Sequence, residues 1–479
     1  MRDHVAVYVN GRRHEVRGTQ VFEPLSEFLR RACRQTGTKV VCAEGDCGSC
    51  TVLIGRAGPH GITYRAVTSC IQYMAQLDAA HVVTIEGLAA AGALNAVQQA
   101  MVVHHGAQCG FCTPGIVVTL CSLFDRVPHP SRHDVTRALV GNLCRCTGYV
   151  AIVSAALATS AASMPSVAEL YPEKTLLPEL RRLASETVLV RDGDRSAYKP
   201  AAFNEALAFK AANPGCTVLA GGTDLGVVWN KRKREPNQLL CLGALEELRG
   251  LVVDQRSLSA GAAVTLADLE IATQAAIPQF YEMLDRFGSP PIRNAGTLGG
   301  NIANGSPIGD TMPGLMVLDA EVELASVRGR RRVNINEFYT GYRQTVLEPD
   351  ELIARVIVPL PADGDQFRLF KVSKRRDLDI STFAAAVWMR LDDGVIREAR
   401  IAYGGVAATI VRLRATEAWL CERNFSEPTL REAGRRARKE IKPISDVRGS
   451  AAYRLLLAEN ILVKFFHDVQ REIKMTHVE

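Results

Sequence analysis

Cysteines are crowded around residue 45 of this chain. The stretch VCAEGDCGSC places Cys42, Cys47 and Cys50 within nine residues, and Cys70 follows at a distance. C-x4-C-x2-C with one later cysteine is the plant-type spacing for a [2Fe–2S] cluster, in which four thiolates converge on iron. Zinc is the alternative, but zinc sites prefer paired CxxC knuckles, and a four-residue spacer containing glycine fits them poorly.

A second group of four cysteines follows in QCGFCTPG and NLCRCTGY, namely Cys109, Cys112, Cys144 and Cys146. On spacing alone, CxxC…CxC could equally hold zinc. The context favours iron, because Pro114 starts an apolar helix directly after Cys112. The later pair follows SRHDVTRALV, a helix that Ser131 and Asp134 are expected to cap. These thiolates would lie at helix ends, where the N-terminal dipole favours anionic ligands.

Composition indicates a reducing compartment, where clustered cysteines are metal ligands more often than disulfides. The 479 residues include 13 cysteines and have a net charge of +6. We find no signal-peptide core and no apolar run that would span a bilayer, so we expect a cytoplasmic protein without a membrane or nucleic-acid partner. KRKRE at 231–235 is typical of a solvated helix face. The remaining cysteines are expected to be small buried hydrophobes, with the first two on apolar helix faces: Cys33, Cys121, Cys216, Cys241 and Cys421.

Hydrophobic periodicity and turn signals place the main elements, and the length predicts two to three domains. Val5, Val7 and Val9 alternate before Asn10-Gly11, which predicts a type I′ hairpin. Asp393-Gly394 predicts a second hairpin. Pro24 is expected to open a helix with Leu25, Phe28, Leu29 and Ala32 on one face. Further expectations are a strand at 62–69, helices at 93–105, 412–422, 429–440 and 449–473, a linker within 158–185, and a new α/β pattern from about 190.

Two glycine-rich segments suggest a diphosphate site. They are TVLAGGTDLGV at 217–227 and RNAGTLGGNIANGSPIGD at 293–310. We expect each to follow an apolar strand, so that successive N–H groups could form a nest for a pyrophosphate. Neither matches GxGxxG, which excludes a Rossmann fingerprint. Taken singly, each segment is weak evidence, because a glycine-rich loop is more often an ordinary turn.

The two cysteine sets, in this order and with all eight spacings, resemble the two [2Fe–2S] domains of the xanthine oxidase family of molybdenum hydroxylases. The glycine-rich segments resemble the FAD domain of the same family. The resemblance implies a multidomain α+β chain in five parts: a β-grasp ferredoxin-like [2Fe–2S] domain (1–88), a four-helix-bundle [2Fe–2S] domain (89–162), a linker (163–188), a vanillyl-alcohol-oxidase-like FAD-binding domain (189–362) and a C-terminal flavoprotein-type α+β domain (363–479).

The resemblance also implies which residues contact FAD. Residues around the diphosphate would be Val218, Leu219, Ala220, Gly221, Gly222, Thr223, Asp224 and Leu225 on one side and Thr297, Leu298, Gly299, Gly300 and Asn301 on the other. Asp310 would bond to sugar hydroxyls and Phe287 would pack near the adenine, while Ile353 and Lys371 match flavin-contacting positions. SKRRDLDI is one residue longer than the matching loop of animal members, so Lys374, Arg375 and Asp377 are either near the flavin and NAD or part of a solvated charged loop.

The function implied by the resemblance is electron transfer. The chain ends where the family's molybdopterin-binding portion would begin, as in bacterial members that are split into subunits. We therefore expect a molybdopterin-binding large subunit as partner, a dimer of heterodimers, purine oxidation by the complex, and electron flow through two [2Fe–2S] clusters and FAD to NAD+. An aldehyde or other N-heterocycle hydroxylase subunit is the alternative, and a non-enzymatic iron–sulfur protein is a third.

Overall fold

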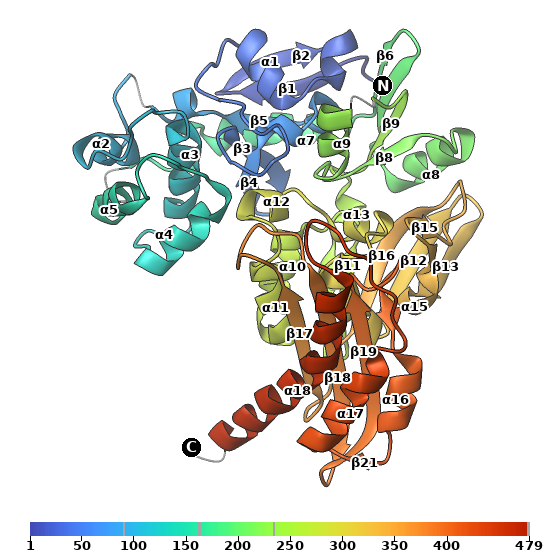
Figure 1. Ribbon diagram of the computed structural model, residues 1–479. Coiled ribbons are helices and arrows are strands. Elements are labelled where there is room, and N and C mark those ends of the chain that lie inside the picture. Colours follow the sequence, from blue (N-terminus) through green and yellow to red (C-terminus); the bar gives the residue numbers. More distant parts are fainter. Residues whose placement is uncertain (90–91, 161–163, 233–234, 477–479) are drawn as a thin grey trace. The chain divides into compact units, whose positions relative to one another are not determined.

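The computed structural model describes residues 1–89, 92–160, 164–232 and 235–476, with side chains to residue 472. The chain forms two compact units (Figure 1). Unit 1 comprises Met1–Glu247 with Gly288–Thr297, and unit 2 comprises Leu248–Phe287 with Leu298–Glu479. These limits differ from those of the five expected domains, whose boundaries remain predictions.

The N-terminal part of unit 1 is a five-stranded mixed sheet packed against one helix. Its strands, in the order β2-β1-β5-β3-β4, are β2 (Arg12–Val16), β1 (Val5–Val9), β5 (Ala80–Val83), β3 (Thr51–Gly58) and β4 (Gly61–Thr68), with α1 (Leu25–Arg31) alongside. Only β1 and β5 pair in parallel. Asn10 (φ 49°) and Gly11 (φ 78°) both adopt the left-handed conformation that a type I′ turn requires, so the predicted hairpin is confirmed.

The sheet contains a buried histidine that makes folding sensitive to pH. His81 on β5 is fully buried; its Nε2 accepts from the Gly11 backbone N–H (3.1 Å), and its Nδ1 lies 2.7 Å from the Tyr64 hydroxyl. Burial lowers the pKa of His81 from 6.5 to about 4. Between these values the unfolded chain binds the extra proton and the folded one does not, so acidification favours unfolding.

We expect the local stability of β1, β3 and β5 to fall by about 2 kcal/mol between pH 6.5 and 5, from about 1.4 kcal/mol for each pH unit below the unfolded pKa. Amide hydrogen exchange, corrected for its intrinsic pH dependence, measures this opening free energy. His81→Gln should remove the extra loss, whereas His133→Gln, at an exposed position, should retain it. Equal pH slopes in the wild-type protein and His81→Gln would contradict the assignment.

Four helices follow this sheet, as expected: α2 (Ala96–Val103), α3 (Thr113–Phe124), α4 (Arg132–Ala138) and α5 (Val150–Ala158). The predicted capping box is confirmed, since the Asp134 N–H donates to Ser131 Oγ (3.2 Å) and the Ser131 N–H donates to the Asp134 carboxylate (2.8 Å). Every residue from Gly115 to Phe124 is buried, so α3 is the central helix of this group.

The segment expected to be a linker contains helical structure, although residues 161–163 lie outside the described part of the chain. It contains α6 (Val167–Leu170) and α7 (Glu173–Ala184). Leu176, Leu180 and Leu183 are buried one helical turn apart, which is the spacing of an amphipathic helix. Pro178, inside α7, and the surrounding small residues concealed this period in the sequence.

The rest of unit 1 is a four-stranded sheet with strands in the order β6 (Val188–Asp192), β7 (Arg195–Lys199), β9 (Gln238–Cys241) and β8 (Thr217–Leu219), together with α8 (Phe203–Ala212), α9 (Leu225–Arg232) and α12 (Pro290–Arg293). Lys231 and Arg232 are exposed at the end of α9, as predicted for KRKRE, of which residues 233–234 lie outside the described part. Because β7, β9 and β8 are parallel, their carboxyl ends share one edge, the usual ligand-binding edge of such sheets.

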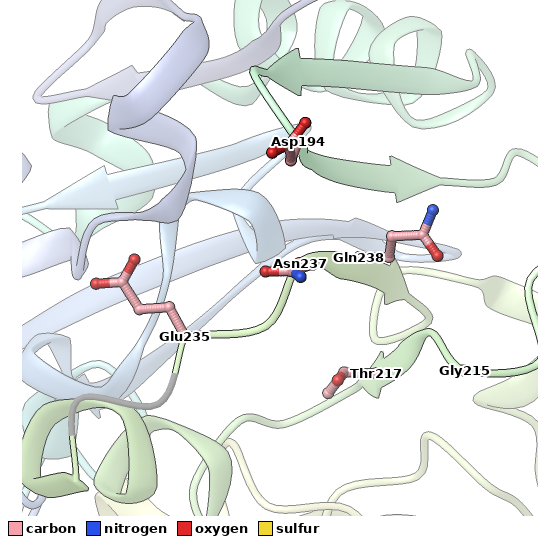
Figure 2. A pocket seen from close by; sticks show the side chains of 6 residues that line it. All are labelled: Asp194, Gly215, Thr217, Glu235, Asn237 and Gln238. Carbon is pink, nitrogen blue, oxygen red and sulfur yellow. The ribbon is translucent and has the colours of Figure 1, made fainter.

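A polar hollow lies at the opposite, amino-terminal edge of these strands (Figure 2). It has a volume of about 540 Å³ and is lined by Asp194, Gly215, Thr217, Glu235, Asn237 and Gln238. The carboxylates of Asp194 and Glu235 would repel a diphosphate. Of the predicted diphosphate segments only Thr217, the first residue of the segment at 217–227, lines this hollow, and none of the cluster cysteines does, so it is not the expected cofactor site.

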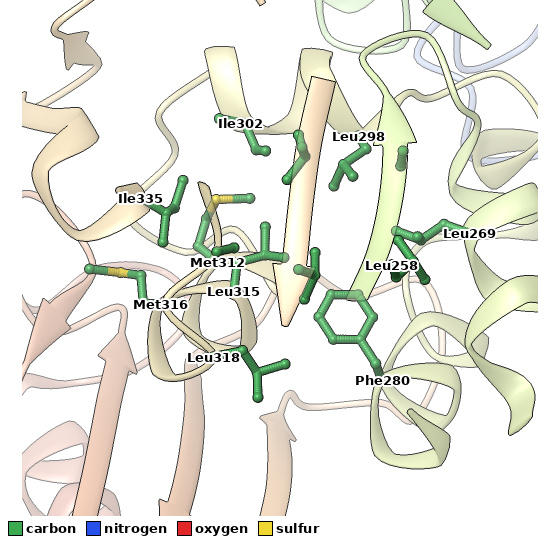
Figure 3. Packing of buried hydrophobic residues seen from close by; sticks show 14 of the residues in the cluster. Leu258, Leu269, Phe280, Leu298, Ile302, Met312, Leu315, Met316, Leu318 and Ile335 are labelled. Carbon is green, nitrogen blue, oxygen red and sulfur yellow. The ribbon is translucent and has the colours of Figure 1, made fainter. Parts of the chain in front are cut away.

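Unit 2 begins with an antiparallel sheet, ordered β10 (Leu251–Val253), β11 (Ser257–Gly261), β16 (Leu352–Pro359), β12 (Glu321–Ser326) and β13 (Gly329–Asn334). Around it lie α10 (Leu266–Ala276), α11 (Pro278–Asp285), α13 (Leu298–Ala303), α14 (Thr311–Val317), α15 (Ile335–Phe338) and the small hairpin of β14 (Tyr339–Gly341) and β15 (Gln344–Thr345). Figure 3 shows Leu298, Ile302 and Phe280 directed into the shared apolar core.

The second sheet of unit 2 contains β17 (Gln366–Val372), β18 (Phe383–Asp392), β19 (Val395–Gly404) and β20 (Val411–Arg412), with β21 (Arg423–Asn424) paired to β19. The predicted Asp393-Gly394 hairpin is confirmed, with φ of 48° and 74°. The closing helices are α16 (Arg414–Leu420), α17 (Glu427–Ala437) and α18 (Ala451–Thr476). Within the described residues, no helix combines the length and apolarity needed to cross a membrane.

The isolated cysteines are buried at three of five positions. Cys121, Cys216 and Cys241 are buried, as expected, whereas Cys33 and Cys421 are partly exposed. The expectation for Cys33 was wrong because α1 ends at Arg31, which leaves Cys33 beyond the helix and Ala32 exposed.

Candidate iron–sulfur and flavin sites

The first cysteine set converges at one end of the N-terminal sheet. Cys42, Cys47 and Cys50 lie in the loop before β3, and Cys70 lies in a short 3-10 turn (Ser69–Ile71) after β4. The thiol of Cys42 contacts those of Cys47 and Cys70, and the thiol of Cys50 contacts that of Cys70. Gly45 (φ 80°) and Gly48 (φ 68°) occupy left-handed conformations that let the loop fold around the thiols.

The electrostatics of this set suit a cationic occupant. Contacts with Cys47 and Cys70 lower the pKa of Cys42, while contacts with Cys42 and Cys50 raise the pKa of Cys70 far above its usual range. Crowded thiols cannot all ionise, because each thiolate repels the next. Iron placed among them would remove that repulsion and allow all four to bind as thiolates.

The predicted placement of the second set at helix ends is confirmed for Cys112 and not for the other three cysteines, which lie in loops. Cys112 is the N-cap residue of α3, and Cys144 and Cys146 lie in the turn before α5. The thiols meet as two pairs, Cys109 with Cys146 and Cys112 with Cys144. The Cys144 N–H donates to the Tyr149 hydroxyl (2.8 Å), which fixes this turn.

This paired arrangement bears on the choice between iron and zinc. The second set forms two separate thiol pairs rather than one group of four. A [2Fe–2S] cluster distributes its four cysteines over two irons, which suits two thiol pairs. The residues therefore fit a two-iron cluster better than one tetrahedral zinc.

The two cysteine loops are in direct contact within unit 1. The Leu143 N–H donates to the Cys47 carbonyl (2.9 Å), and Asn142 Nδ2 donates to the Gly48 carbonyl (3.2 Å). A Cβ on Gly115, in the first turn of α3, would lie 2.1 Å from the Gly48 oxygen. Sequence reasoning missed Asn142, because nothing local shows that it reaches a loop 94 residues away.

The first glycine-rich segment follows a strand, as expected. It leaves the carboxyl end of β8 at Leu219 and leads into α9 at Leu225. A Cβ on Gly221 would lie 2.1 Å from the Ala295 carbonyl oxygen, so only glycine fits between the two backbones. Gly222 has a φ of 74°, and a Cβ added to it would lie 2.8 Å from the Gln76 side-chain amide. The segment thus lies at the sheet edge where ligands of parallel strands bind.

The second glycine-rich segment differs from the prediction. It follows the short helix α12 rather than a strand, because Pro290 and Pro291 initiate a helical turn there. It continues into α13, where the Leu298 and Gly299 N–H groups donate to the Val264 (3.0 Å) and Ala262 (2.9 Å) carbonyls. Thr297 belongs to unit 1 and the residues from Leu298 to unit 2. Two N–H groups of the expected nest are thus engaged within the protein.

Asp310 and Lys371 form a buried ion pair within unit 2. Lys371 Nζ donates to Asp310 Oδ2 (2.5 Å) and to Ser381 Oγ (3.0 Å), and Ser381 Oγ donates to Asp310 Oδ1 (2.5 Å). Sequence reasoning missed Ser381, the member that completes this network. The expected contacts of Asp310 with sugar hydroxyls and of Lys371 with flavin remain predictions.

The other predicted flavin residues of unit 2 are placed differently. Ile353 on β16 is buried in the apolar core of unit 2, and Phe287 is partly buried and packs against the same core. Lys374 and Arg375 are exposed; Lys374 Nζ donates to the Val447 carbonyl (3.0 Å), and Arg375 pairs with Asp379. These contacts fit the alternative of a solvated charged loop for this pair of residues, while a role for Asp377 stays a prediction.

Family models match most of the chain. Residues 84–157 match a [2Fe-2S] binding domain, 193–361 the FAD binding domain in molybdopterin dehydrogenase, and 368–469 the CO dehydrogenase flavoprotein C-terminal domain. These matches agree with the multidomain α+β fold expected from sequence.

Curated relatives match almost the entire chain. Xanthine dehydrogenase of Emericella nidulans is 28% identical over 98% of this chain, and Aldehyde oxidase 3 of Rattus norvegicus is 29% identical over 98%. The chain spans only 39% and 40% of those two proteins.

Solved structures match part of the chain. Carbon monoxide dehydrogenase from Hydrogenophaga pseudoflava is 30% identical with a TM-score of 0.53, and the match covers 56% of this chain and 93% of that one. Quinoline 2-oxidoreductase from Pseudomonas putida 86 is 27% identical with the same TM-score of 0.53, covering 56% and 94%. Together with the two cysteine sets and the three domain matches, these similarities show that the chain belongs to the xanthine oxidase family of molybdenum hydroxylases.

Proposed function

We propose that this chain is the iron–sulfur and FAD electron-transfer subunit of a xanthine dehydrogenase. The supporting observation is that two complete sets of four cysteines and an FAD-binding domain occur on one chain, with the two cysteine loops in backbone contact. The xanthine dehydrogenase match extends over 98% of the chain, whereas the carbon monoxide dehydrogenase structure matches 56%. Aldehyde oxidase 3 matches equally far, so an aldehyde-oxidising complex is the second candidate.

The residues of this chain have distinct tasks in that function. Cys42, Cys47, Cys50 and Cys70 would hold one [2Fe–2S] cluster, and Cys109, Cys112, Cys144 and Cys146 the other. Bound clusters exchange single electrons and bound FAD exchanges one or two, which would connect oxidation of a substrate to reduction of NAD+. The protein's own contribution is to hold the two loops together and to bury three of the four thiols of the first set, those of Cys47, Cys50 and Cys70.

The helical part of unit 1 provides the surface proposed for the molybdopterin-binding partner. Two of its proposed ligands, Cys109 and Cys146, are exposed. Exposed large apolar side chains occur next to cysteines in the sequence, at Phe111 and Leu143, and on α2 and α5 of the same helical part, at Val102, Val103, Val150 and Leu157. Apolar side chains gathered at a surface are typical of protein interfaces, and partner contact would cover the cysteines.

Reduction of the isolated chain by NADH, in which electrons enter at the flavin, tests the proposal. Loaded with its cofactors, the chain alone is expected to be bleached by NADH, first in the flavin and then in the cluster absorbance, because hydride transfer at flavin is reversible. NADH should also support reduction of an artificial dye, and xanthine should change nothing until the molybdopterin subunit is added.

A cysteine variant separates electron flow from the molybdopterin subunit from electron flow that starts at the flavin. In the assembled complex, Cys109→Ser should stop xanthine-to-NAD+ turnover and largely preserve NADH-to-dye activity. Reduction of the lone chain by xanthine, or loss of both activities in a folded, flavin-loaded variant, would refute the proposed division of labour. Turnover of an aldehyde but not of xanthine by the complex would select the second candidate.

A further inference from the structure

We propose that Gln72, Gln76 and Asn230 act together as a clasp that makes FAD binding and assembly of the first cluster mutually dependent. The inference rests on the proposed function, since it concerns the cofactors proposed there. All three residues and every contact used below lie within unit 1.

Asn230 connects the helix after the glycine-rich segment to the first cysteine loop. It lies on α9, and its Nδ2 donates to the carbonyls of Cys70 (2.8 Å) and Ala43 (2.9 Å). Ala43 follows Cys42 directly and has a φ of 53°. One side chain therefore holds the backbone at two cysteines whose thiols contact each other.

The side-chain oxygen of Asn230 is used as well. Asn230 Oδ1 accepts from the Tyr73 hydroxyl (3.0 Å), and the Tyr73 ring packs edge-on against Trp229, with ring centroids 4.5 Å apart. A Cβ on Gly226 would lie 2.6 Å from the Ile71 carbonyl oxygen, so α9 and the backbone after Cys70 are in close contact. Helix α9 cannot move without moving the segment that contains Cys70.

Gln72 and Gln76 connect the segment after Cys70 to the backbone of the glycine-rich segment. Gln72 and Gln76 follow Cys70 and are 6% and 9% exposed. Gln72 Nε2 donates to the Gly221 carbonyl (3.1 Å), and Gln76 Nε2 donates to the Ala220 carbonyl (2.8 Å). The Tyr73 N–H donates to Gln76 Oε1 (2.9 Å), which fixes the orientation of that amide. The proposed diphosphate segment is therefore held by residues two and six positions beyond a proposed cluster ligand.

Reciprocal coupling follows from these contacts. Without iron, the crowded thiols around Cys70 lose the occupant that holds them together, and the 70–76 segment loses its anchor. The glycine-rich segment would then be free to shift. Because binding free energies are linked, an occupied flavin site must stabilise the first cluster by the same factor by which that cluster stabilises flavin. The second cysteine set shares none of the three clasp residues.

Flavin titration of deflavinated protein tests the coupling. We expect Cys42→Ser, which lacks the first cluster, to bind FAD at least tenfold more weakly than the wild type, a difference of about 1.4 kcal/mol. Cys112→Ser is the matched control, because it removes a ligand of the other set, and its FAD affinity should stay within twofold. In flavin-free protein, the electron paramagnetic resonance signal of the first cluster should decay faster than that of the second.

A double-mutant cycle assigns the effect to the clasp. Gln72→Leu with Gln76→Leu should weaken FAD binding by a similar factor while both cluster signals remain, and adding Cys42→Ser should then cause little further loss. If the double variant does not fold, as judged by its second cluster signal, Gln72→Leu and Asn230→Ala singly take its place. Independent, additive effects would overturn the clasp, whereas a wild-type chain that binds no FAD would instead overturn the proposed function.

Discussion

Cys112→Ser is expected to abolish one [2Fe–2S] electron paramagnetic resonance signal completely and to leave the other intact, and Cys42→Ser should do the reverse. The reason is that the thiols meet in two separate sets: each thiol contact described above joins two members of the same set. A serine hydroxyl is a much poorer iron ligand than a thiolate. Iron content should fall by about half in each variant.

Cys121→Ser provides a matched control on the same helix as Cys112. Cys121 is buried in α3, where its sulfur accepts from Asn95 Nδ2 (3.5 Å), and it contacts no other cysteine among the interactions described. Both signals should survive in this variant. Loss of the same signal in Cys42→Ser and Cys112→Ser, or zinc in place of iron in anaerobically purified protein, would show that the cluster assignment is wrong.

Features set by neighbouring residues were predictable from the sequence. The two hairpins follow from Asn-Gly and Asp-Gly, which accept positive φ at little cost, and α4 follows from the reciprocal Ser131–Asp134 contacts. The closely spaced cysteines were also predictable as candidate cluster ligands, namely Cys42, Cys47 and Cys50 and the pairs Cys109/Cys112 and Cys144/Cys146. In each of these cases a short stretch contains both the cause and the effect.

Features set by distant contacts were not predictable. Nothing near Gln72 or Asn230 indicates that their amides bind carbonyls 149 and 160 residues away. Ser381 belongs with Asp310 only because β17 and the start of β18 bring it there. The helix α7 was missed for a related reason: its leucines gain their stability from burial against the N-terminal sheet, so helix propensity alone understated it.

The FAD site gives the second large effect. We expect Gly221→Val to lose its flavin, with FAD affinity reduced tenfold or more. The Cβ would lie 2.1 Å from the Ala295 oxygen and 2.8 Å from its carbonyl carbon, and both atoms belong to backbone that cannot rotate aside. Overpacking of this kind costs about 1–3 kcal/mol, and each 1.4 kcal/mol corresponds to tenfold in affinity.

Two other glycines of the same region allow a graded comparison. Gly222→Ala should have a smaller effect, because the atoms it would meet, at 2.8 Å, belong to the flexible Gln76 side chain, although its φ of 74° adds strain. Gly215→Val should retain FAD, since nothing lies within 4 Å of its Cβ position. Flavin content after gel filtration measures the order, and the second cluster signal reports whether each variant is folded. If Gly221→Val kept its flavin while Gly215→Val lost it, the glycine-rich segment after β8 could not be the diphosphate site, because the tight approach of its backbone to Ala295 would then have no bearing on FAD.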